Sequence, residues 1–423
     1  MAYTPNGAFD AYLETIKGPF VKLARLRFLN PDGSTAFALD NSEQSRYAGA
    51  FLSDGSLNVN LQNGCRRTAT VTISNVDHRF DYNVNNLWFG QEIALDEGVV
   101  LPDGSDFYIQ QGIFLAETPT ETLEPDNRTV TYNLTDKWSM LDGTLSGNLD
   151  GTYEVSRGTN IFDPIVSLLS EDRGNGLPLD RMTPVFTEYY NNLPPQELPD
   201  GTTAPVLDSP YTLRVEGDTG SIATVILGLA EMLNAWVGYD RTGALTVEPS
   251  QDDILDQEKP LAWRFSMGDV RFLGATYTIK NTEVYNDYIV VGEQMDDYSQ
   301  PWGRAQNNDP KSPTNIKTIG RKTFREQRPG FATDKQCEDL AVWKLKRAAV
   351  LQSAVSISCG QILHLRENEL VEIVREDKPG NPVETHLIMG FSRPLSGLGE
   401  MTIEAVSVND LPDATAVQRE ETE

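Results

Sequence analysis

The sequence has few of the residues that build covalent cross-links. It contains three cysteines in 423 residues, an odd number, and none of them forms a CxxC pair: Cys65, Cys337 and Cys359. This spacing argues against a disulfide framework and against a zinc knuckle. We therefore expect the cysteines to be small buried apolar residues.

Histidine is equally scarce, and the common catalytic and nucleotide-binding motifs are absent. His78, His364 and His386 are scattered, without an HExxH motif or a Ser-His-Asp signature. No Walker or Rossmann glycine pattern occurs, and the Asp-Gly pairs lack the regular oxygen ligands of a calcium loop. The sequence thus predicts no catalytic residue, no cofactor site and no metal site.

Long apolar runs are missing as well. No stretch approaches the roughly twenty apolar residues that a membrane-spanning helix needs. Residues 1–7 have neither the basic start nor the apolar centre of a secretion signal. We expect no membrane anchor and folding in the cytoplasm.

Basic residues are strongly outnumbered. The chain has 35 Lys and Arg against 62 Asp and Glu, a net charge of -27. A DNA duplex presents a dense line of phosphates that such a protein repels, which disfavours a DNA-binding role. Two interpretations of the acidity remain open: it keeps the protein soluble, or the protein lines a conduit through which DNA slides without sticking.

Paired carboxylates for acid/base catalysis offer only weak candidates. Asp252 with Asp253, and Glu369 with Glu372, lie close in sequence. Chance proximity is expected among 62 acidic residues, so we interpret both pairs as solvated surface. Most of the six Trp and fifteen Tyr fall at strand or helix positions that favour a core rather than a sugar-binding platform. We predict that the chain is not an enzyme.

The clearest pattern that is present lies near the C-terminus. Thr333 and Gln336 form a capping box, which predicts a helix that continues to about residue 349. Val355, Ile357 and Cys359 then alternate with small polar residues, as in a half-buried strand. The sequence predicts an amphipathic helix that lies on a sheet, followed by a β-meander.

That meander has a faint earlier copy. The apolar segments 369–373, 385–391 and 401–410 match 91–95, 107–114 and 128–136 in order and rough spacing. The similarity indicates a duplicated unit. The alternative, that any two antiparallel meanders look alike at this level, remains open.

A chain of this length holds two to four domains. Alternating segments and turns predict a mainly β protein with α+β parts. We expect an N-terminal arm (1–17), a β domain (18–145) that closes into a barrel or sandwich, an α+β domain (146–262) with a helix at 221–236, a second β domain (263–412) with an inserted loop (295–314), and a disordered tail (413–423).

The order of these elements resembles the hub proteins at the tail tips and baseplates of tailed bacteriophages and of related contractile injection systems. The resemblance spans nearly the whole chain and rests on six segments: 69–75, 107–114, 131–136, 221–247, 285–292 and the helix with its meander from 333 onward. None of these segments is a catalytic signature, so the resemblance depends on their order.

The resemblance implies a structural protein of the virion. It implies two β-barrels per chain that are similar to those of the tail tube, and a homotrimer that joins a six-fold tail tube to a three-fold tip. It further implies a channel with acidic walls through which the genome passes without sequence-specific binding. The implied partners are the tail tube or a distal tail protein, and a tip fibre, spike or tape-measure protein. Longer relatives continue into a fibre-binding or wall-degrading region, which this sequence does not contain.

Two other functions remain open at this stage. One is a hexameric ring protein that joins the tail tube to the hub and usually lacks the second barrel. The other is a carbohydrate-binding or carbohydrate-degrading tip protein. The latter predicts glycan binding or hydrolysis that is lost when exposed aromatic or acidic residues are substituted.

Overall fold

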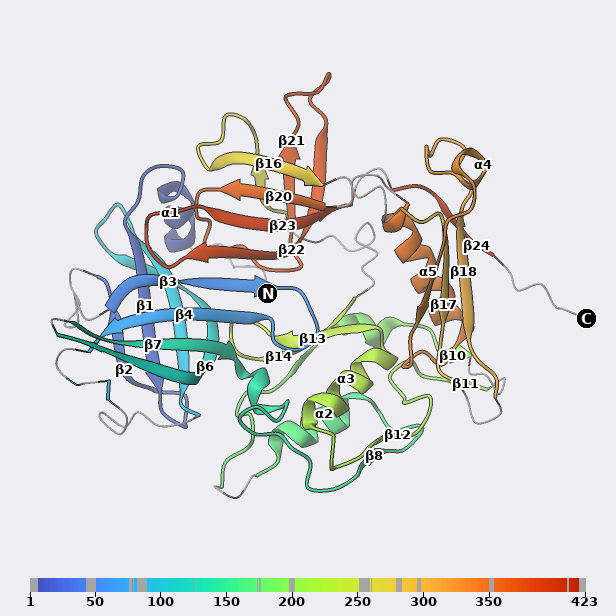
Figure 1. Cartoon of the computed structure of the whole chain (residues 1–423), viewed down its shortest axis with the longest axis horizontal. Helices are drawn as coiled ribbons and strands as arrows, with labels where there is room; N and C mark the ends of the chain where they lie inside the picture. The colour runs from blue at the N-terminus through green and yellow to red at the C-terminus, as the bar shows by residue number, and fades with distance from the viewer. Residues whose placement is uncertain are drawn as a thin grey trace, which may run out of the picture.

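The structure of the chain is a computed structural model. It describes residues 7–42, 51–75, 78, 80–81, 90–125, 127–172, 174, 176–197, 202–250, 259, 261–278, 284–294, 298–349, 354–408 and 411–417. The chain is mainly β, as the sequence predicts, and one large sheet dominates it (Figure 1).

This large sheet contains thirteen strands from both ends of the chain. The N-terminal part supplies β1 (Lys22–Leu29), β2 (Thr35–Asp40), β3 (Phe51–Asn60), β4 (Arg67–Ser74), β5 (Glu92–Val100), β6 (Asp106–Glu124) and β7 (Asn127–Asp136). The C-terminal part supplies β15 (Leu261–Phe265), β16 (Phe272–Thr278), β20 (Ala354–Cys359), β21 (Leu370–Val374), β22 (Val383–Pro394) and β23 (Met401–Ser407).

The two parts are joined by the antiparallel pair β22 and β3, in which Phe391 lies opposite Val59. The path of the sheet is β16-β20-β23-β22-β3-β4-β7-β6-β5-β1-β2. The two predicted β domains therefore share one continuous sheet, and the described strands form no closed barrel. Local alternation predicts strands but not which strand edges meet, so this connection lay beyond the sequence pattern.

The strand order occurs twice within this sheet. The first copy runs β3-β4-β7-β6-β5, and the second runs β16-β20-β23-β22, with β21 on the far side of β22. All neighbours within each copy are antiparallel. The repeated order agrees with the internal similarity between 91–136 and 369–410.

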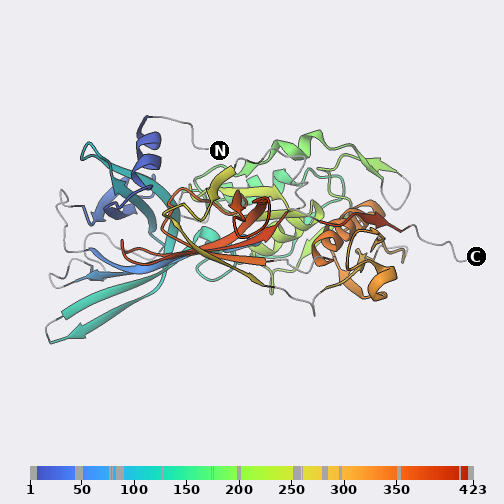
Figure 2. The same cartoon turned by 90° about the horizontal axis from the view of Figure 1, so that it is seen from above.

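One hydrophobic core serves both copies. Phe114 and Val71 from the first copy pack in the same cluster as Ile357 and Ile403 from the second. Helix α1 (Gly7–Thr15) adds Phe9 and Tyr12 to this core, so the predicted arm contains a packed helix. Figure 2 shows α1 on one side of the sheet and the β6–β7 hairpin extending past the sheet's edge.

The middle unit, residues 137–250, is α+β, in agreement with the α+β character expected for this region. It contains η1 (Lys137–Met140), β8 (Tyr153–Val155), α2 (Phe162–Ser170), β9 (Val185–Phe186), η2 (Glu188–Asn192), β10 (Gln196–Glu197), β11 (Thr203–Ala204), β12 (Leu213–Val215), α3 (Ile222–Met232), β13 (Ala235–Tyr239) and β14 (Leu245–Pro249). The predicted helix 221–236 starts correctly, because Ser221 caps α3, but α3 ends at Met232. Asn234 has a positive φ of 47° and turns the chain into β13.

The C-terminal unit is a small sheet with a helix packed on it. It contains β17 (Asp287–Val291), β18 (Trp302–Asn307), α4 (Ile316–Ile319), β19 (Thr323–Gln327), α5 (Asp334–Ala348) and β24 (Ala414–Ala416). Thr333 caps α5 as predicted. Two predictions are wrong here: β18 lies in the expected loop 295–314, and β24 lies in the expected disordered tail 413–423. The two strands pair with each other, which orders both segments. No helix in the described part of the chain is long and apolar enough to cross a membrane.

Candidate assembly surfaces

The carboxylates considered for catalysis are engaged in ion pairs. Glu369 Oε1 accepts a hydrogen bond from Arg366 at 2.9 Å, and Glu372 accepts one from Arg264 at 2.5 Å. Asp252 and Asp253 lie outside the described residues. Glu369 and Glu372 thus pair with two different arginines.

The cysteines and histidines are not brought together. Burial raises the pKa of each thiol to about 12: Cys65, Cys337 and Cys359. His78 is exposed beside Asp81. His364 is half-buried beside Tyr12, and His386 is buried near Glu384. No group of three His, Cys, Asp or Glu side chains in the described ranges could hold a metal ion.

His364 and His386 make stability depend on pH. Burial, opposed in part by neighbouring hydrogen bonds or charges, lowers the pKa of His364 and of His386 to about 4. The unfolded chain binds these protons near pH 6.5, so stability falls as pH decreases from 6.5 to 4. Each histidine then lowers the free energy of unfolding by about 3 kcal/mol at pH 4. In urea unfolding at pH 6.5 and 4.5, His386→Gln should lose less stability than wild type. Equal losses in the two proteins would contradict this assignment.

A buried charge cluster ties the two copies of the sheet together. Glu97 on β5 forms ion pairs with Lys22 at 2.7 Å and with Arg393 at 2.6 Å, and the three side chains are at most 1% exposed. Arg393 also donates to Gln111 Oε1 at 2.6 Å and to the Ile362 carbonyl at 3.1 Å. Burial alone would raise the pKa of Glu97, but Arg393 and Lys22 hold it below its usual value. The cluster therefore links β1, β5 and β22, which lie far apart in the sequence.

Further ion pairs join the other units in the same way. Arg67 pairs with Glu367 at 2.6 Å across the two copies. Two pairs connect the large sheet to the middle unit: Arg66 with Glu248, and Arg181 with Glu92. Lys137 pairs with Asp180 inside the middle unit and lies 3.9 Å from Glu92 of β5. Buried charges of this kind tolerate little displacement, because each partner would be left unpaired. The large sheet and the middle unit are therefore held in one defined arrangement.

The face of the large sheet opposite the core is rich in hydroxyl and amide side chains. Residues on β3, β4, β7, β20, β22 and β23 that alternate with core residues are almost all neutral: Ser56, Asn58, Asn60, Thr68, Thr70, Thr72, Ser74, Thr129, Thr131, Asn133, Thr135, Ser356, Ser358, Ser392 and Thr402. Glu404 on β23 is an exception. In a chain with 23% charged residues, this hydroxyl face is a distinct surface.

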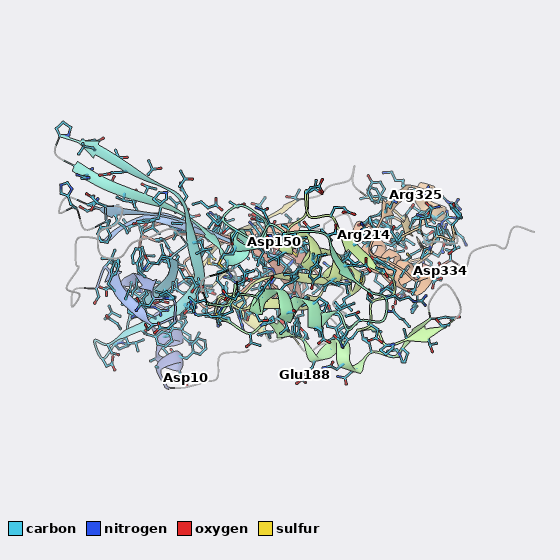
Figure 3. All side chains as sticks on the ribbon, turned by 90° about the horizontal axis from the view of Figure 1, so that it is seen from below. Asp10, Asp150, Glu188, Arg214, Arg325 and Asp334 are labelled. Atoms are coloured by element: carbon cyan, nitrogen blue, oxygen red, sulfur yellow. The ribbon has the colours of Figure 1, made fainter. Side chains whose placement is uncertain are left out.

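Two of the strand edges that have no partner among the described residues are relevant to assembly. The outer edge of β16 is one, because β16 pairs only with β20. The other is the distal half of β6, which pairs with β5 up to Leu115 and beyond that only with β7. Figure 3 shows this hairpin standing away from the body of the molecule. Leu273 on β16 is 56% exposed and Leu123 on β6 is 74% exposed. Unpaired edges with exposed apolar residues are typical of strand-to-strand assembly.

Comparison with solved structures identifies this architecture. A tail protein from Neisseria meningitidis matches with a TM-score of 0.56 at 9% identity, over 93% of this chain and 98% of that chain. The 43 kDa tail protein of prophage MuSo2 from Shewanella oneidensis matches with a TM-score of 0.55 at 12% identity, over 91% and 98%. Prophage tail protein gp18 from Listeria monocytogenes matches with a TM-score of 0.51 at 10% identity, over 91% and 94%. The chain has the fold of phage tail proteins.

The tail-protein fold covers the whole arrangement of the units rather than one of them, because each match spans more than nine-tenths of this chain. No protein-family model matches the sequence, and no curated protein matches it. The similarity to tail proteins expected from the order of elements is thus confirmed at the level of structure.

Proposed function

We propose that this chain is a homotrimeric hub at the tip or baseplate of a phage tail. It joins the six-fold tail tube to a three-fold tip, lines the DNA channel and has a structural rather than an enzymatic role. The tail-protein fold supports this proposal. In this proposal residues 18–145 and 263–412 are the two tube-like units and residues 146–262 are the domain between them. The tail tube or a distal tail protein binds one side of the ring, and a tip or tape-measure protein binds the other.

The repeated strand order is the observation that carries the proposal. Within one chain, β3 of the first copy pairs with β22 of the second through Ser56–Asn60 and Gly390–Pro394. This contact lies on the same side of β22 as β21 but farther along the strand. The contact between β3 and β22 joins the first copy to the second and uses none of the strand pairs inside either copy.

The equivalent contact between chains uses the two unpaired edges. By strand order, β16 corresponds to β3 and β6 corresponds to β22. Beyond Leu115, β6 has no partner among the described residues along one edge. This edge, in the C-terminal half of the strand, corresponds to the part of β22 that pairs with β3. Pairing β16 of one chain with β6 of the next repeats the internal contact. Three chains with two copies each then give six similar units in a closed ring, which is how three-fold and six-fold symmetry are matched.

The mass of the purified chain in solution tests this proposal. Light scattering over a wide concentration range should give three times the chain mass of 46.9 kDa. A hexamer would instead support the ring that joins tube to hub. A monomer at every concentration would contradict self-assembly into a hub.

The hydroxyl face is the surface that we assign to the channel. Neutral hydroxyls offer a duplex neither the ion pairs that would hold it nor a wall of carboxylates. This differs from the acidic wall implied by the family resemblance, because the net charge of -27 is carried mostly elsewhere. The ring formed through β16 and β6 makes this face continuous from chain to chain.

Lysines on the hydroxyl face should convert a passive channel into a DNA-binding one. The variant carries Thr68→Lys, Asn133→Lys and Ser358→Lys, which adds nine positive charges per trimer. Its retention of a short duplex should appear at 50 mM salt and disappear by 200 mM, because counterion release controls such binding. The matched control places three lysines on exposed sites of the middle unit: Ser167→Lys, Ser170→Lys and Thr219→Lys. Equal DNA retention by the two variants would argue against a channel at this face.

A further inference from the structure

A cavity of about 480 Å³ lies where the C-terminal unit meets the large sheet and the middle unit. Its walls come from three separately folded parts of the chain. They include Trp343, Lys344, Arg347 and Ala348 of α5, Tyr285 and Tyr288 at β17, Phe324 of β19, Trp236 and Ser250 of the middle unit, and Leu61, Leu387, Met389 and Val406 of the large sheet. We call this cavity the aromatic pocket.

The walls of the aromatic pocket suit a large apolar group. Five aromatic rings line it, and two of them, Tyr285 and Tyr288, pack against Phe324 with centroid distances of 4.9 Å and 5.2 Å. Aliphatic side chains from β22 and β23 close the opposite wall. Pockets of this size and composition accept an aromatic or branched apolar side chain.

The charged residues in the pocket are all cations. Lys344 and Arg347 line it, and no carboxylate does so among the described residues. The guanidinium carbon of Arg347 lies 4.4 Å from the centre of the Trp343 ring. Glu326 lies 3.9 Å from Lys344 and accepts a hydrogen bond from Tyr288 at 2.6 Å. In a chain of net charge -27, this is a local reversal of sign that favours an anionic occupant.

The pocket also contains an unused hydrogen-bond donor. Trp343 Nε1 is buried and has no acceptor among the described residues. An indole N–H can only donate, and leaving it unpaired in a buried place costs free energy. A carbonyl or carboxylate oxygen of an occupant would satisfy it. Burial, opposed in part by Glu326, also lowers the pKa of Lys344, which an added negative charge would offset.

We propose that the aromatic pocket binds an acidic peptide segment of a partner protein. An aromatic or branched apolar side chain of the peptide enters the pocket between Phe324 and Trp343. A carboxylate next to it pairs with Lys344 and Arg347, and a peptide oxygen accepts from Trp343 Nε1. The inference concerns a contact with a different protein and stands whether or not the chain forms a trimer.

A random decapeptide display library selected on the full chain tests this proposal. We expect enrichment of peptides that combine Asp or Glu with Phe, Trp, Leu or Ile. Selection on the double variant Lys344→Glu/Arg347→Glu should lose that enrichment at least tenfold. The variant Lys346→Glu is the matched control, because Lys346 lies on the same helix and does not line the pocket. It should keep the enrichment.

Binding of one enriched peptide to the three proteins then gives the decisive comparison by calorimetry. Tenfold or greater weakening in the double variant, with wild-type affinity in Lys346→Glu, supports the pocket. Three results would overturn it: no enrichment of acidic peptides, equal binding to the double variant, or equal loss in Lys346→Glu. Far-ultraviolet circular dichroism of each variant shows that the fold is intact before binding is compared.

Discussion

Glu97→Gln is expected to destabilise the chain by at least about 3–5 kcal/mol, the range for a buried pair that loses one partner. The substitution leaves Lys22 and Arg393, both at most 1% exposed, facing each other as two buried cations. Removing Arg393 instead leaves the pair of Lys22 and Glu97 intact, so Arg393→Met should cost less. The free energy of unfolding in guanidinium chloride measures both.

The effect of Glu97→Gln should grow as pH falls from the alkaline range toward neutrality, and it should shrink below about pH 4, where wild type loses the stability that ionised Glu97 contributes. Burial, together with Arg393, already favours the neutral form of Lys22, and Glu97 opposes this by favouring the charged form. Without Glu97, protonation of Lys22 at lower pH decreases the free energy of unfolding, because the buried side chain favours its neutral form. The exposed pair of Arg214 and Glu216 provides a control (Figure 3 shows Arg214 at the surface). Glu216→Gln should change stability by less than about 1 kcal/mol. A similarly small loss for Glu97→Gln would contradict the role of the cluster.

Lys137→Met is the second substitution with a large expected effect. Lys137 donates to Asp180 at 2.5 Å, and neither side chain is exposed. In this variant Asp180 keeps its hydrogen bonds from Tyr239 and from the Met182 amide, but its carboxylate no longer has a cation as a partner. We expect a loss of about 3–5 kcal/mol, because a buried carboxylate is left without its cation.

A double-mutant cycle separates the ion pair from simple loss of packing. Lys137→Met/Asp180→Asn removes both charges, so it should be more stable than Lys137→Met alone by 1 kcal/mol or more. Guanidinium chloride unfolding of the four proteins gives the coupling. Additive effects would show that the two residues act independently and would argue against a stabilising pair inside the middle unit.

Local patterns in the sequence predicted the elements that depend on local physics. The cap at Thr333 fixed the start of α5, and the alternation of Val355, Ile357 and Cys359 fixed β20. Both features act within a few residues, through a backbone amide or the two faces of a strand. The same is true of the cap at Ser221, although the end of α3 depended on the conformation of Asn234.

The elements that were missed depend on partners far along the chain. β18 is polar, but α5 packs so closely on it that a Cβ at Gly303 would lie 2.2 Å from the Glu338 nitrogen. β24 is ordered by β18, more than a hundred residues earlier. The joining of β3 to β22 likewise pairs residues over three hundred positions apart. No window of local sequence contains such information.

The buried charges escaped the sequence analysis for a related reason. Among 62 acidic residues, a carboxylate is normally solvated, and no feature of the sequence around Glu97 identifies Arg393 as its partner. One signal was available: β5 is buried on both faces along most of its length, and its strand contains Asp96 and Glu97 side by side. Adjacent carboxylates in a strand with few turn residues indicate that at least one points into the interior.

The contact between β16 of one chain and β6 of the next is tested most directly by disulfide cross-linking. The variant carries Thr276→Cys on β16 and Thr122→Cys on β6, and the control pairs Thr276→Cys with Thr131→Cys on β7, one strand farther away. A disulfide needs Cα atoms about 4.4–6.8 Å apart, so only the first pair, or its neighbour Thr120→Cys, should cross-link. A ring joined through β16 and β6 should give a covalent trimer on a non-reducing gel after mild oxidation. Monomers only, or equal cross-linking in the control, would contradict the shared-sheet ring.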